Sequence, residues 1–326
     1  MYTEGRKKEN ALVSQHDLLV RVSKMYYELN MTQSHIAQDL GLSRVKVTRM
    51  LARARELGIV TISIRGNARP YEDLEAALIA AYGLKAARVV PAIGPGESAR
   101  ENVAREAAAQ LAAHLSEGMT VAIGASRTVA KIPDFADEGI GRGVTFVPAS
   151  GGYAGADRSL NPDHVAQLLA DRTRGRSFAL AAPLVGFDEE VASRIASNDA
   201  VDSVLSRARG AQVFLAGIGT RINGAAWGHA ALAPEIDETE LGDLVRRGAL
   251  SDISGRFFDR EGREVDGAFN RRVIALTLEE IRKIPHRIVA TEGADRSEPL
   301  ISAVGAGLFN VVVIDRDNAV ALLEAR

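Results

Sequence analysis

The stretch between Gln33 and Ala52 constrains the fold of this chain more than any other segment. Its apolar residues are spaced as in two short amphipathic helices, and Gly41 lies between them, where a tight turn favours a residue without Cβ. Thr32 and Ser43 are suited to cap the first and the second helix. The residues expected to face inward are Ile36, Ala37, Leu40, Val47, Met50 and Leu51. This pattern predicts a helix-turn-helix, whose second helix enters the major groove of DNA.

The outward face of the predicted second helix is cationic and can form hydrogen bonds. We expect Arg44, Thr48 and Arg49 to contact base edges, while Lys46 and Arg53 lie nearer phosphates. The alternative is an ordinary helical hairpin with a solvated basic face, but the glycine, the caps and the basic face in register favour DNA binding. The candidate DNA-binding residues are Gln33, Ser43, Arg44, Val45, Lys46, Thr48, Arg49 and Arg53.

The segment after the second helix predicts a wing. Residues from Ile59 to Ile64 alternate between apolar and polar, as in a half-buried strand. We therefore expect a flexible basic tail over residues 1–13, a winged helix-turn-helix over 14–65 and a linker over 66–70.

The distribution of charge supports this division. The whole chain has a net charge of −2, which does not suggest a polyanionic partner. Residues 1–69, however, contain 12 Lys and Arg against 6 Asp and Glu, a balance of +6, which leaves 28 basic and 36 acidic residues, or −8, in the remainder. A basic head on an acidic body concentrates the attraction for phosphates at one end and favours operator DNA as a partner.

Composition excludes several other classes of protein. The 326 residues include no cysteine, so disulfides and thiolate metal sites are excluded. No apolar run is long enough to span a bilayer, and the N-terminus has no apolar signal core. We expect a cytoplasmic protein of two domains without a membrane partner.

Beyond the linker, short apolar runs alternate with helical patterns. Several runs are almost continuously apolar, as in strands buried on both faces of a parallel sheet. The predicted strands are Ala87–Val90, Thr120–Ile123, Val144–Val147, Phe178–Ala182, Gln212–Ala216, Val273–Leu276, Arg287–Ala290 and Val311–Asp315. The predicted helices include Tyr71–Tyr82, Glu101–Leu115, Asp163–Asp171 and Pro299–Gly305. The fold class expected for residues 71–326 is α/β with a mostly parallel sheet.

Three predicted strand ends, 123–129, 148–155 and 216–224, are rich in glycine and hydroxyl groups. Ligands of such sheets bind beyond the carboxyl ends of the strands. In the first loop, Ser126 and Thr128 are placed to donate to an oxyanion, and Arg127 to neutralise it. Each loop alone is more readily explained as a tight turn, but three on one sheet favour a small polar ligand with an anionic group. The third loop lacks the full GxGxxG spacing, which disfavours a nicotinamide cofactor.

With both halves considered, the chain resembles the SorC family of sugar-responsive transcriptional regulators. The similarity runs over nearly the whole length and includes IGASRTV, VTFVPASGG, AQVFLAGIG, GALSDISGRFFDREG and the closing stretch from IVATEGADRSEPL. In the more specific pattern around Asp252, Ser251 replaces the family's glycine. The resemblance implies a DNA-binding regulator of a carbohydrate operon, controlled by a carbohydrate effector. It also implies dimers that pair into tetramers, and no cofactor.

The resemblance also implies an effector site, because the family's effector domain is similar to sugar-phosphate isomerases and glucosamine-phosphate deaminases. By this similarity, residues 126–128 form the first phosphate-facing loop. Arg296 stands where many members have a phosphate-facing lysine, and Glu292 replaces a glycine. These departures make a free sugar or polyol a serious alternative to a phosphorylated sugar. The predicted effector-binding residues are Gly124, Ser126, Arg127, Thr128, Gly151, Gly152, Asp252 and Arg296.

The main alternative function is a sugar-phosphate isomerase or deaminase with an appended DNA-binding head. Such an enzyme needs a positioned acid/base pair, and no cluster of His, Asp and Glu stands out, so we expect no catalysis. His164 and His229 lack metal-ligand spacing, so we expect no metal site. Asp252 either contacts ligand hydroxyls or, like Asp259, caps backbone N–H groups. Trp227 either stacks on a sugar or packs within the protein.

Overall fold

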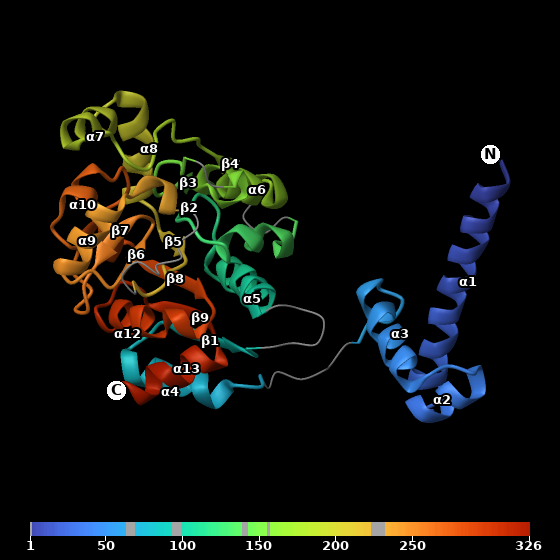
Figure 1. Ribbon diagram of the computed structural model, residues 1–326. Helices are drawn as coiled ribbons and strands as arrows, with labels where there is room; N and C mark the ends of the chain where they lie inside the picture. The colour runs from blue at the N-terminus through green and yellow to red at the C-terminus, as the bar shows by residue number, and fades with distance from the viewer. Residues whose placement is uncertain (1, 63–68, 93–98, 139–142, 155–156, 223–231) are drawn as a thin grey trace. The chain divides into compact units, whose positions relative to one another are not determined.

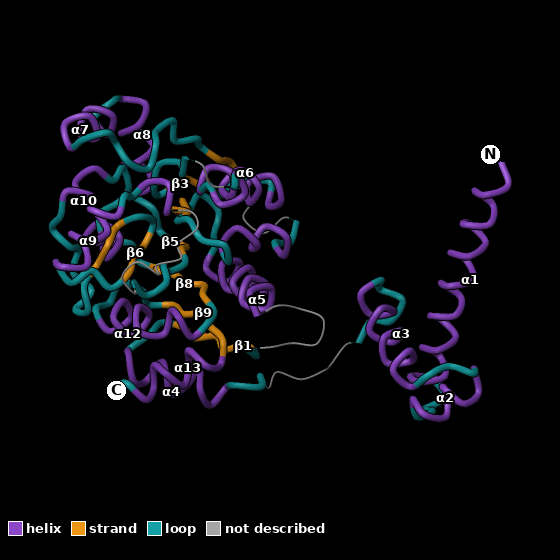
Figure 2. Tube along the Cα trace, in the orientation of Figure 1, coloured by secondary structure: helices purple, strands orange, loops and turns teal. Residues whose placement is uncertain are grey.

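The computed structural model describes all residues except 1, 63–68, 93–98, 139–142, 155–156 and 223–231. The chain divides into two compact units, residues 1–68 and 69–326 (Figure 1). The first is helical and the second combines helices and strands (Figure 2). Within the described parts of the chain, no helix combines the length and the apolar composition required to cross a bilayer.

The first unit consists of α1 (Tyr2–Tyr27), α2 (Gln33–Leu40) and α3 (Arg44–Glu56). The caps are those predicted from the sequence. Thr32 Oγ1 accepts from the backbone N–H of His35 and Ser43 Oγ from that of Lys46, each at 3.2 Å, and Gly41 adopts a left-handed conformation with φ of 62°. The apolar residues that meet between the three helices are Leu19, Val22, Ile36, Ala37, Val47, Met50 and Leu51.

Two segments of this unit differ from expectation. Helix α1 includes residues 2–13, where we expected a flexible tail. The run from Arg6 to Glu9 contains only Arg, Lys and Glu, which favour helix. The strand predicted over 59–64 is absent from its described part, residues 59–62. There the N–H of Val60 bonds to Ala54 O (3.2 Å), at the end of α3, so it is not available to a strand ladder. Residues 63 and 64 lie outside the described residues.

The second unit contains a sheet of seven parallel strands in the order β1-β9-β8-β5-β2-β3-β4. The strands are β1 (Ala86–Val90), β2 (Thr120–Ile123), β3 (Thr145–Pro148), β4 (Arg176–Ser177), β5 (Val213–Ala216), β8 (His286–Thr291) and β9 (Val311–Asp315). Successive side chains face opposite sides of the sheet. On β5, Phe214 packs into the core on one face and Leu215 into the core on the other.

Helices cover both faces of this sheet. One face packs against α4 (Glu72–Tyr82), α8 (Asp199–Arg209), α11 (Leu278–Lys283), α12 (Ser297–Gly305) and α13 (Arg316–Glu324). The other packs against α5 (Ala99–His114), the 3-10 helix η1 (Val129–Phe135) and α6 (Pro162–Thr173). Burial on both faces explains why the strands are almost continuously apolar.

Two of the predicted strands lie outside the sheet. Arg176–Ser177, just before the predicted strand Phe178–Ala182, pairs as β4. Within the predicted strand, the N–H of Leu180 bonds to Asp163 Oδ1 (2.9 Å). Val273–Leu276 forms isolated bridges only. These runs are apolar because they pack against loops and helices. The sequence pattern alone does not distinguish this kind of burial from burial within a sheet.

A smaller layer follows the sheet. It contains the antiparallel hairpin of β6 (Ser251–Ile253) and β7 (Arg256–Phe258) with α9 (Glu238–Arg246) and α10 (Ala268–Arg272), around Phe257 and Phe269. Among the described residues, the other helices are η2 (Arg158–Leu160), α7 (Glu189–Ala196), η4 (Ala233–Glu235) and η5 (Ala294–Arg296). The N–H of Gly219, just after β5, bonds to Asp252 O on β6 (2.9 Å). The hairpin therefore lies beside the carboxyl end of a central strand.

Candidate functional site

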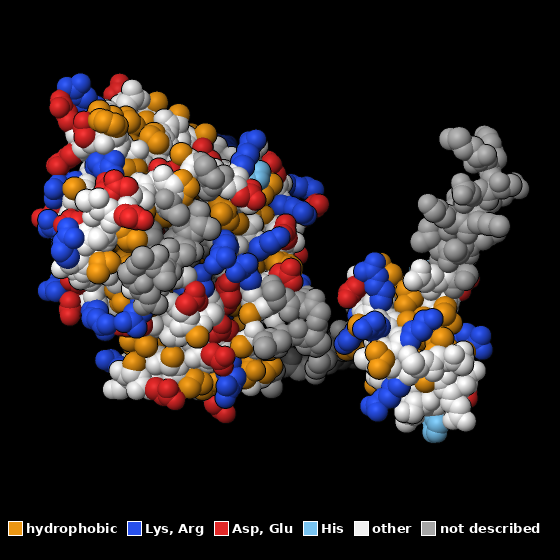
Figure 3. Space-filling view, viewed as in Figure 1, with side chains coloured by type: hydrophobic (Ala, Val, Ile, Leu, Met, Phe, Trp, Pro, Cys, Tyr) orange, Lys and Arg blue, Asp and Glu red, His pale blue; other side chains and the backbone are white. Residues whose placement is uncertain are grey.

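The outward face of α3 is exposed and basic, as Figure 3 shows in part. Within the described residues, Arg44, Lys46 and Arg49 form no ion pair with an acidic side chain, whereas Arg53 pairs with Glu56 at 2.8 Å. Val45 is 62% exposed, so its apolar side chain is accessible on the same face. This face therefore presents one apolar side chain and three cations, Arg44, Lys46 and Arg49, without acidic partners among the described residues.

Helix α2 contributes one polar contact to this face. Thr48 Oγ1 donates to Gln33 Oε1 at 2.7 Å and lies 3.0 Å from Arg44 O. The hydrogen bond fixes the Gln33 amide, at the start of α2, beside α3. Ser43 Oγ accepts the capping bond of α3, and its hydroxyl hydrogen remains able to donate.

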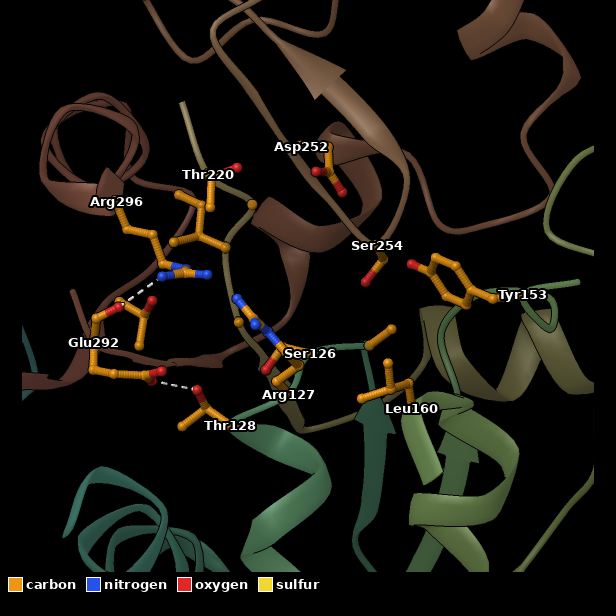
Figure 4. A pocket seen from close by; sticks show the side chains of 15 residues that line it. Ser126, Arg127, Thr128, Tyr153, Leu160, Thr220, Asp252, Ser254, Glu292 and Arg296 are labelled. Atoms are coloured by element: carbon orange, nitrogen blue, oxygen red, sulfur yellow. Dashed lines mark hydrogen bonds between the residues drawn. The ribbon is translucent and has the colours of Figure 1, made fainter. Parts of the chain in front are cut away.

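A pocket lies at the carboxyl ends of β2, β5 and β8, three neighbouring strands in the centre of the sheet (Figure 4). The hairpin residues Asp252 and Ser254 complete it, together with Tyr153 and Leu160. The remaining residues that line it are Ala125, Ser126, Arg127, Thr128, Gly217, Ile218, Gly219, Thr220, Thr291, Glu292 and Arg296. The two loops that we expected to converge, 126–128 and the one containing Arg296, therefore line the same pocket.

Two glycines after β5 permit this arrangement. A Cβ at Gly217 would lie 2.3 Å from Ser126 Cβ, and a Cβ at Gly219 would lie 2.2 Å from Asp252 Oδ1. Both distances are far below van der Waals contact, so only glycine fits. The sequence showed a glycine-rich loop here but not which glycine contacts which segment.

The hydroxyl groups of the first loop are partly used within the protein. Ser126 Oγ accepts from the N–H of Val129 at 2.9 Å. Thr128 Oγ1 donates to Glu292 Oε2 at 2.5 Å (Figure 4). The oxyanion that Thr128 meets is therefore a carboxylate of the protein itself.

Charged side chains gather around Glu292, which is only 7% exposed. Arg100 Nε on α5 lies 2.9 Å from its Oε1, a contact that no local pattern in the sequence indicated. Arg296 Nη1 donates to Glu292 O and to Asp295 Oδ1, each at 2.9 Å. Partial burial, then the positive charges of Arg100 and Arg296, lower the pKa of the Arg127 guanidinium. The lining therefore mixes positive and negative groups.

The opposite wall is polar and buried. Asp252 is 2% exposed, and its Oδ2 accepts from the N–H of Gly255 at 3.0 Å. Ser254 Oγ is buried and has no hydrogen-bond partner among the described residues. Burial, then the charges of Asp252 and Glu235, raise the pKa of the Tyr153 hydroxyl well above its usual value, so it stays protonated. The sequence had not indicated Tyr153 or Ser254.

Three predicted effector-binding glycines do not line the pocket. Gly124 packs against the hairpin, where an added Cβ would lie 2.5 Å from Ser254 Oγ. The N–H of Gly151 bonds to Ile274 O and that of Gly152 to Ala182 O, each at 2.9 Å. An added Cβ at Gly151 would lie 2.1 Å from Pro183 O, so close packing explains Gly124 and Gly151, whereas at Gly152 the nearest atom would be 3.4 Å away, an ordinary contact.

Two other polar residues that the sequence analysis considered, Asp259 and His164, lie in described parts of the chain. Asp259 caps a turn, since its Oδ1 accepts from the N–H groups of Glu261 and Arg263. His164 lies on α6, and the described residues contain no cluster of His, Cys, Asp and Glu suited to a metal. Trp227 and His229 lie outside the described residues.

A chain of ion pairs links α5 to the start of the second unit. Arg88 on β1 lies 3.3 Å from Glu106 on α5 and 3.7 Å from the buried Glu75 on α4. Arg69, the first residue of the unit, pairs with Glu75 at 2.7 Å. The first turn of α5 provides Arg100, so one helix contacts both Glu292 and this cluster.

Comparison with known proteins gives matches over both units. Residues 69–324 match the family described as "Putative sugar-binding domain". The chain is 29% identical over 314 residues to the sorbitol operon regulator of Klebsiella pneumoniae, covering 94% of this chain and 98% of that protein. It is 27% identical over 324 residues to the transcriptional regulator LsrR of Klebsiella pneumoniae subsp. pneumoniae, covering 98% and 97%. The crystal structure of full-length SorC from Klebsiella pneumoniae is similar with a TM-score of 0.71 and 27% identity, over 94% of this chain and 98% of that one.

Proposed function

The chain belongs to the SorC family of sugar-binding transcriptional regulators, and we propose which of its residues bind operator DNA and effector. The observation that supports the effector site is the pocket at the carboxyl ends of β2, β5 and β8, within the part of the chain that matches the sugar-binding family. Its effector is a sugar, a polyol or a sugar phosphate, and its target is a carbohydrate operon. The protein acts in the cytoplasm, where operator DNA is found.

For DNA, the proposal assigns base contacts to Arg44, Thr48 and Arg49 and phosphate contacts to Lys46 and Arg53. Exposure of these side chains on α3 supports the assignment, as does the absence of ion pairs at Arg44, Lys46 and Arg49 among the described residues. A single helix-turn-helix contacts a short half-site, so we propose that two chains pair on a pseudo-palindromic operator, as a dimer or as a dimer of dimers.

For control, the proposal is that the effector stabilises one arrangement of the paired second units. Ligand can shift an equilibrium only by its differential affinity for the two states. Arg100 and Glu106 place α5 in contact with both the pocket residue Glu292 and the ion pairs around Glu75. A ligand that alters the Arg100–Glu292 contact acts on the helix whose Glu106 pairs with Arg88. Arg88 in turn contacts Glu75, the ion-pair partner of Arg69 beside the linker.

The test uses the full-length chain and the DNA upstream of its own gene, with binding followed by fluorescence anisotropy. Hexoses, hexitols and their phosphates are added singly, and at least one is expected to change the affinity for DNA. Arg127→Ala should weaken that response at least about tenfold, because it removes a pocket cation with no ion pair among the described residues.

Arg194→Ala on α7 is the matched control, since it removes an exposed arginine away from the pocket. If Arg127→Ala and Arg194→Ala respond alike to the effector, this pocket is not the effector site.

A further inference from the structure

We propose that the pocket selects an uncharged, polyhydroxylated effector and discriminates against its phosphate ester, because the Glu292 carboxylate already occupies the anion position beside the first loop. The inference rests on the proposed function, which left open whether the effector is phosphorylated. It follows from the contacts that Thr128 and Arg100 make with the Glu292 carboxylate.

Two donors that could bind a phosphate beside this loop, the Thr128 hydroxyl and the Arg100 guanidinium, are already engaged by Glu292, whereas Arg127 forms no ion pair among the described residues. Thr128 is 5% exposed, and its hydroxyl donates to Glu292 Oε2 at 2.5 Å. The Arg100 guanidinium contacts the other carboxylate oxygen at 2.9 Å. A phosphate at the same place would have to displace an ionised carboxylate that is 7% exposed and holds two charge-assisted hydrogen bonds.

The charges of the pocket balance without a charged ligand. Among the described residues that line it are two arginines, Arg127 and Arg296, and two carboxylates, Glu292 and Asp252. Arg100 and Asp295, which contact Glu292 and Arg296, add one charge of each sign. A phosphate ester would add about two negative charges beside two carboxylates, in a site where water is partly excluded. An uncharged ligand leaves the balance as it is.

The remaining groups suit hydroxyl groups of a ligand. The two carboxylates can accept from sugar hydroxyls, and an ionised carboxylate has about four lone-pair sites. Ser254 Oγ is 4% exposed, lines the pocket and lacks a hydrogen-bond partner among the described residues. Buried polar groups need a partner, so a ligand hydroxyl would satisfy it. Thr220 and Tyr153 add further hydroxyls to the lining.

The experiment compares matched pairs of compounds on the full-length protein. The pairs are glucitol and glucitol 6-phosphate, fructose and fructose 6-phosphate, and glucose and glucose 6-phosphate, with inorganic phosphate as a further probe. Thermal shift and calorimetric titration give the relative affinities. In the wild type, the uncharged member of the responding pair should bind at least about 100-fold more tightly, because juxtaposed like charges are strongly unfavourable.

Glu292→Gln keeps an acceptor for Thr128 and removes the charge, so it should bring the affinities of the two members at least about tenfold closer. The same variant should gain measurable stabilisation by millimolar inorganic phosphate. Glu298→Gln is the control, since it neutralises a nearby acid that pairs with Arg221 and Arg260 outside the pocket lining.

The results separate the two proposals. Tighter binding of a phosphate ester than of its parent by the wild type would overturn this inference and leave the sugar-controlled regulator intact. Binding of neither member of any pair, without any effect on DNA affinity, would overturn both proposals. The preference of the wild type decides the question even if Glu292→Gln does not fold.

Discussion

Substitution of Gly217 by alanine is the sharpest test of the pocket's construction. The added Cβ would lie 2.3 Å from Ser126 Cβ and 2.4 Å from its Oγ, whereas real Cβ atoms are almost never closer than 3.0 Å to such neighbours. The first loop would therefore have to move by roughly 1 Å or more to restore van der Waals contact. We expect Gly217→Ala to abolish the effector response, since that loop contains Ser126, Arg127 and Thr128.

Overpacking of this kind costs about 1–3 kcal/mol of folding stability. In a unit of this size, 1 kcal/mol corresponds to a change in Tm of about 2–4 °C, so thermal unfolding of the second unit should occur roughly 2–12 °C lower. Operator affinity without effector should stay within about threefold of the wild type, because no contact of α3 is altered. Calorimetry and anisotropy measure the two quantities on one preparation.

A second substitution tests whether contact with Ser126 causes the loss of stability in Gly217→Ala. The next atom beyond Ser126 is Ala290 O, at 3.5 Å, an ordinary contact. Ser126→Gly should therefore restore part of the lost stability in the Gly217→Ala background, although by itself it removes the hydrogen bond to the N–H of Val129. Gly305→Ala is the control, because nothing lies within 4 Å of its added Cβ. A Gly217→Ala protein with the wild-type Tm and effector response would refute the described packing.

The remaining predictions concern DNA, assembly, pH and coupling. Arg44→Ala and Arg49→Ala should each lose about tenfold or more in operator affinity by anisotropy, whereas Lys46→Ala should weaken all sequences alike; wild-type affinity in both arginine variants would contradict the assignment. Light scattering should give a dimer or tetramer at micromolar concentration, and a monomer with and without DNA would be contrary evidence. Burial and neighbouring positive charges lower the pKa of His286 below its ordinary 6.5. The unfolded chain then binds more protons than the folded chain between that lowered pKa and 6.5, so stability should fall as pH falls through 6.5. His286→Gln should flatten this slope in chemical denaturation. Arg88→Ala should leave effector binding and basal operator affinity near normal but weaken the response, and an unchanged response would exclude α5 as the link.

Local features of the first unit were predictable because their physics is local. Thr32 and Ser43 bond to N–H groups three residues ahead, and Gly41 turns the chain where a left-handed residue is required. Apolar periodicity likewise predicted both inner faces of α2 and α3. The prediction of a strand from Ile59 was wrong for its described residues. Alternation indicates burial on one side but not the presence of a partner strand.

In the second unit, the strands buried on both faces were the predictable ones. Thr120–Ile123 and Val311–Asp315 have the predicted bounds. The hairpin was not predicted as strands, because β6 and β7 have three residues each and their turn depends on Ser254 and Gly255 with positive φ. Apolar runs such as Val273–Leu276 were mistaken for strands because burial against loops gives the same composition.

The candidate pocket was only partly predictable for a related reason. Glycine and hydroxyl groups at strand ends indicated where a ligand would bind, and Ser126, Arg127 and Arg296 do line one pocket. The contacts of Glu292, however, join residues 164 and 192 positions apart, Thr128 and Arg100. Such pairs depend on the order of strands in the sheet, which periodicity does not encode.

Among the described residues, five separate segments of the chain meet in this pocket, the loops after β2, β3, β5 and β8 and the hairpin of β6 and β7. A ligand that contacts all of these segments acts as a cross-link between them, and its full binding free energy is available only in the arrangement where they converge. The strands beneath are packed on both faces and resist deformation, so a change is most easily absorbed at the loops and the hairpin. Binding energy is then converted into a preference for one arrangement of these segments, as a ligand-controlled regulator requires. An enzyme instead has to use its binding energy to bind the transition state more tightly than the substrate.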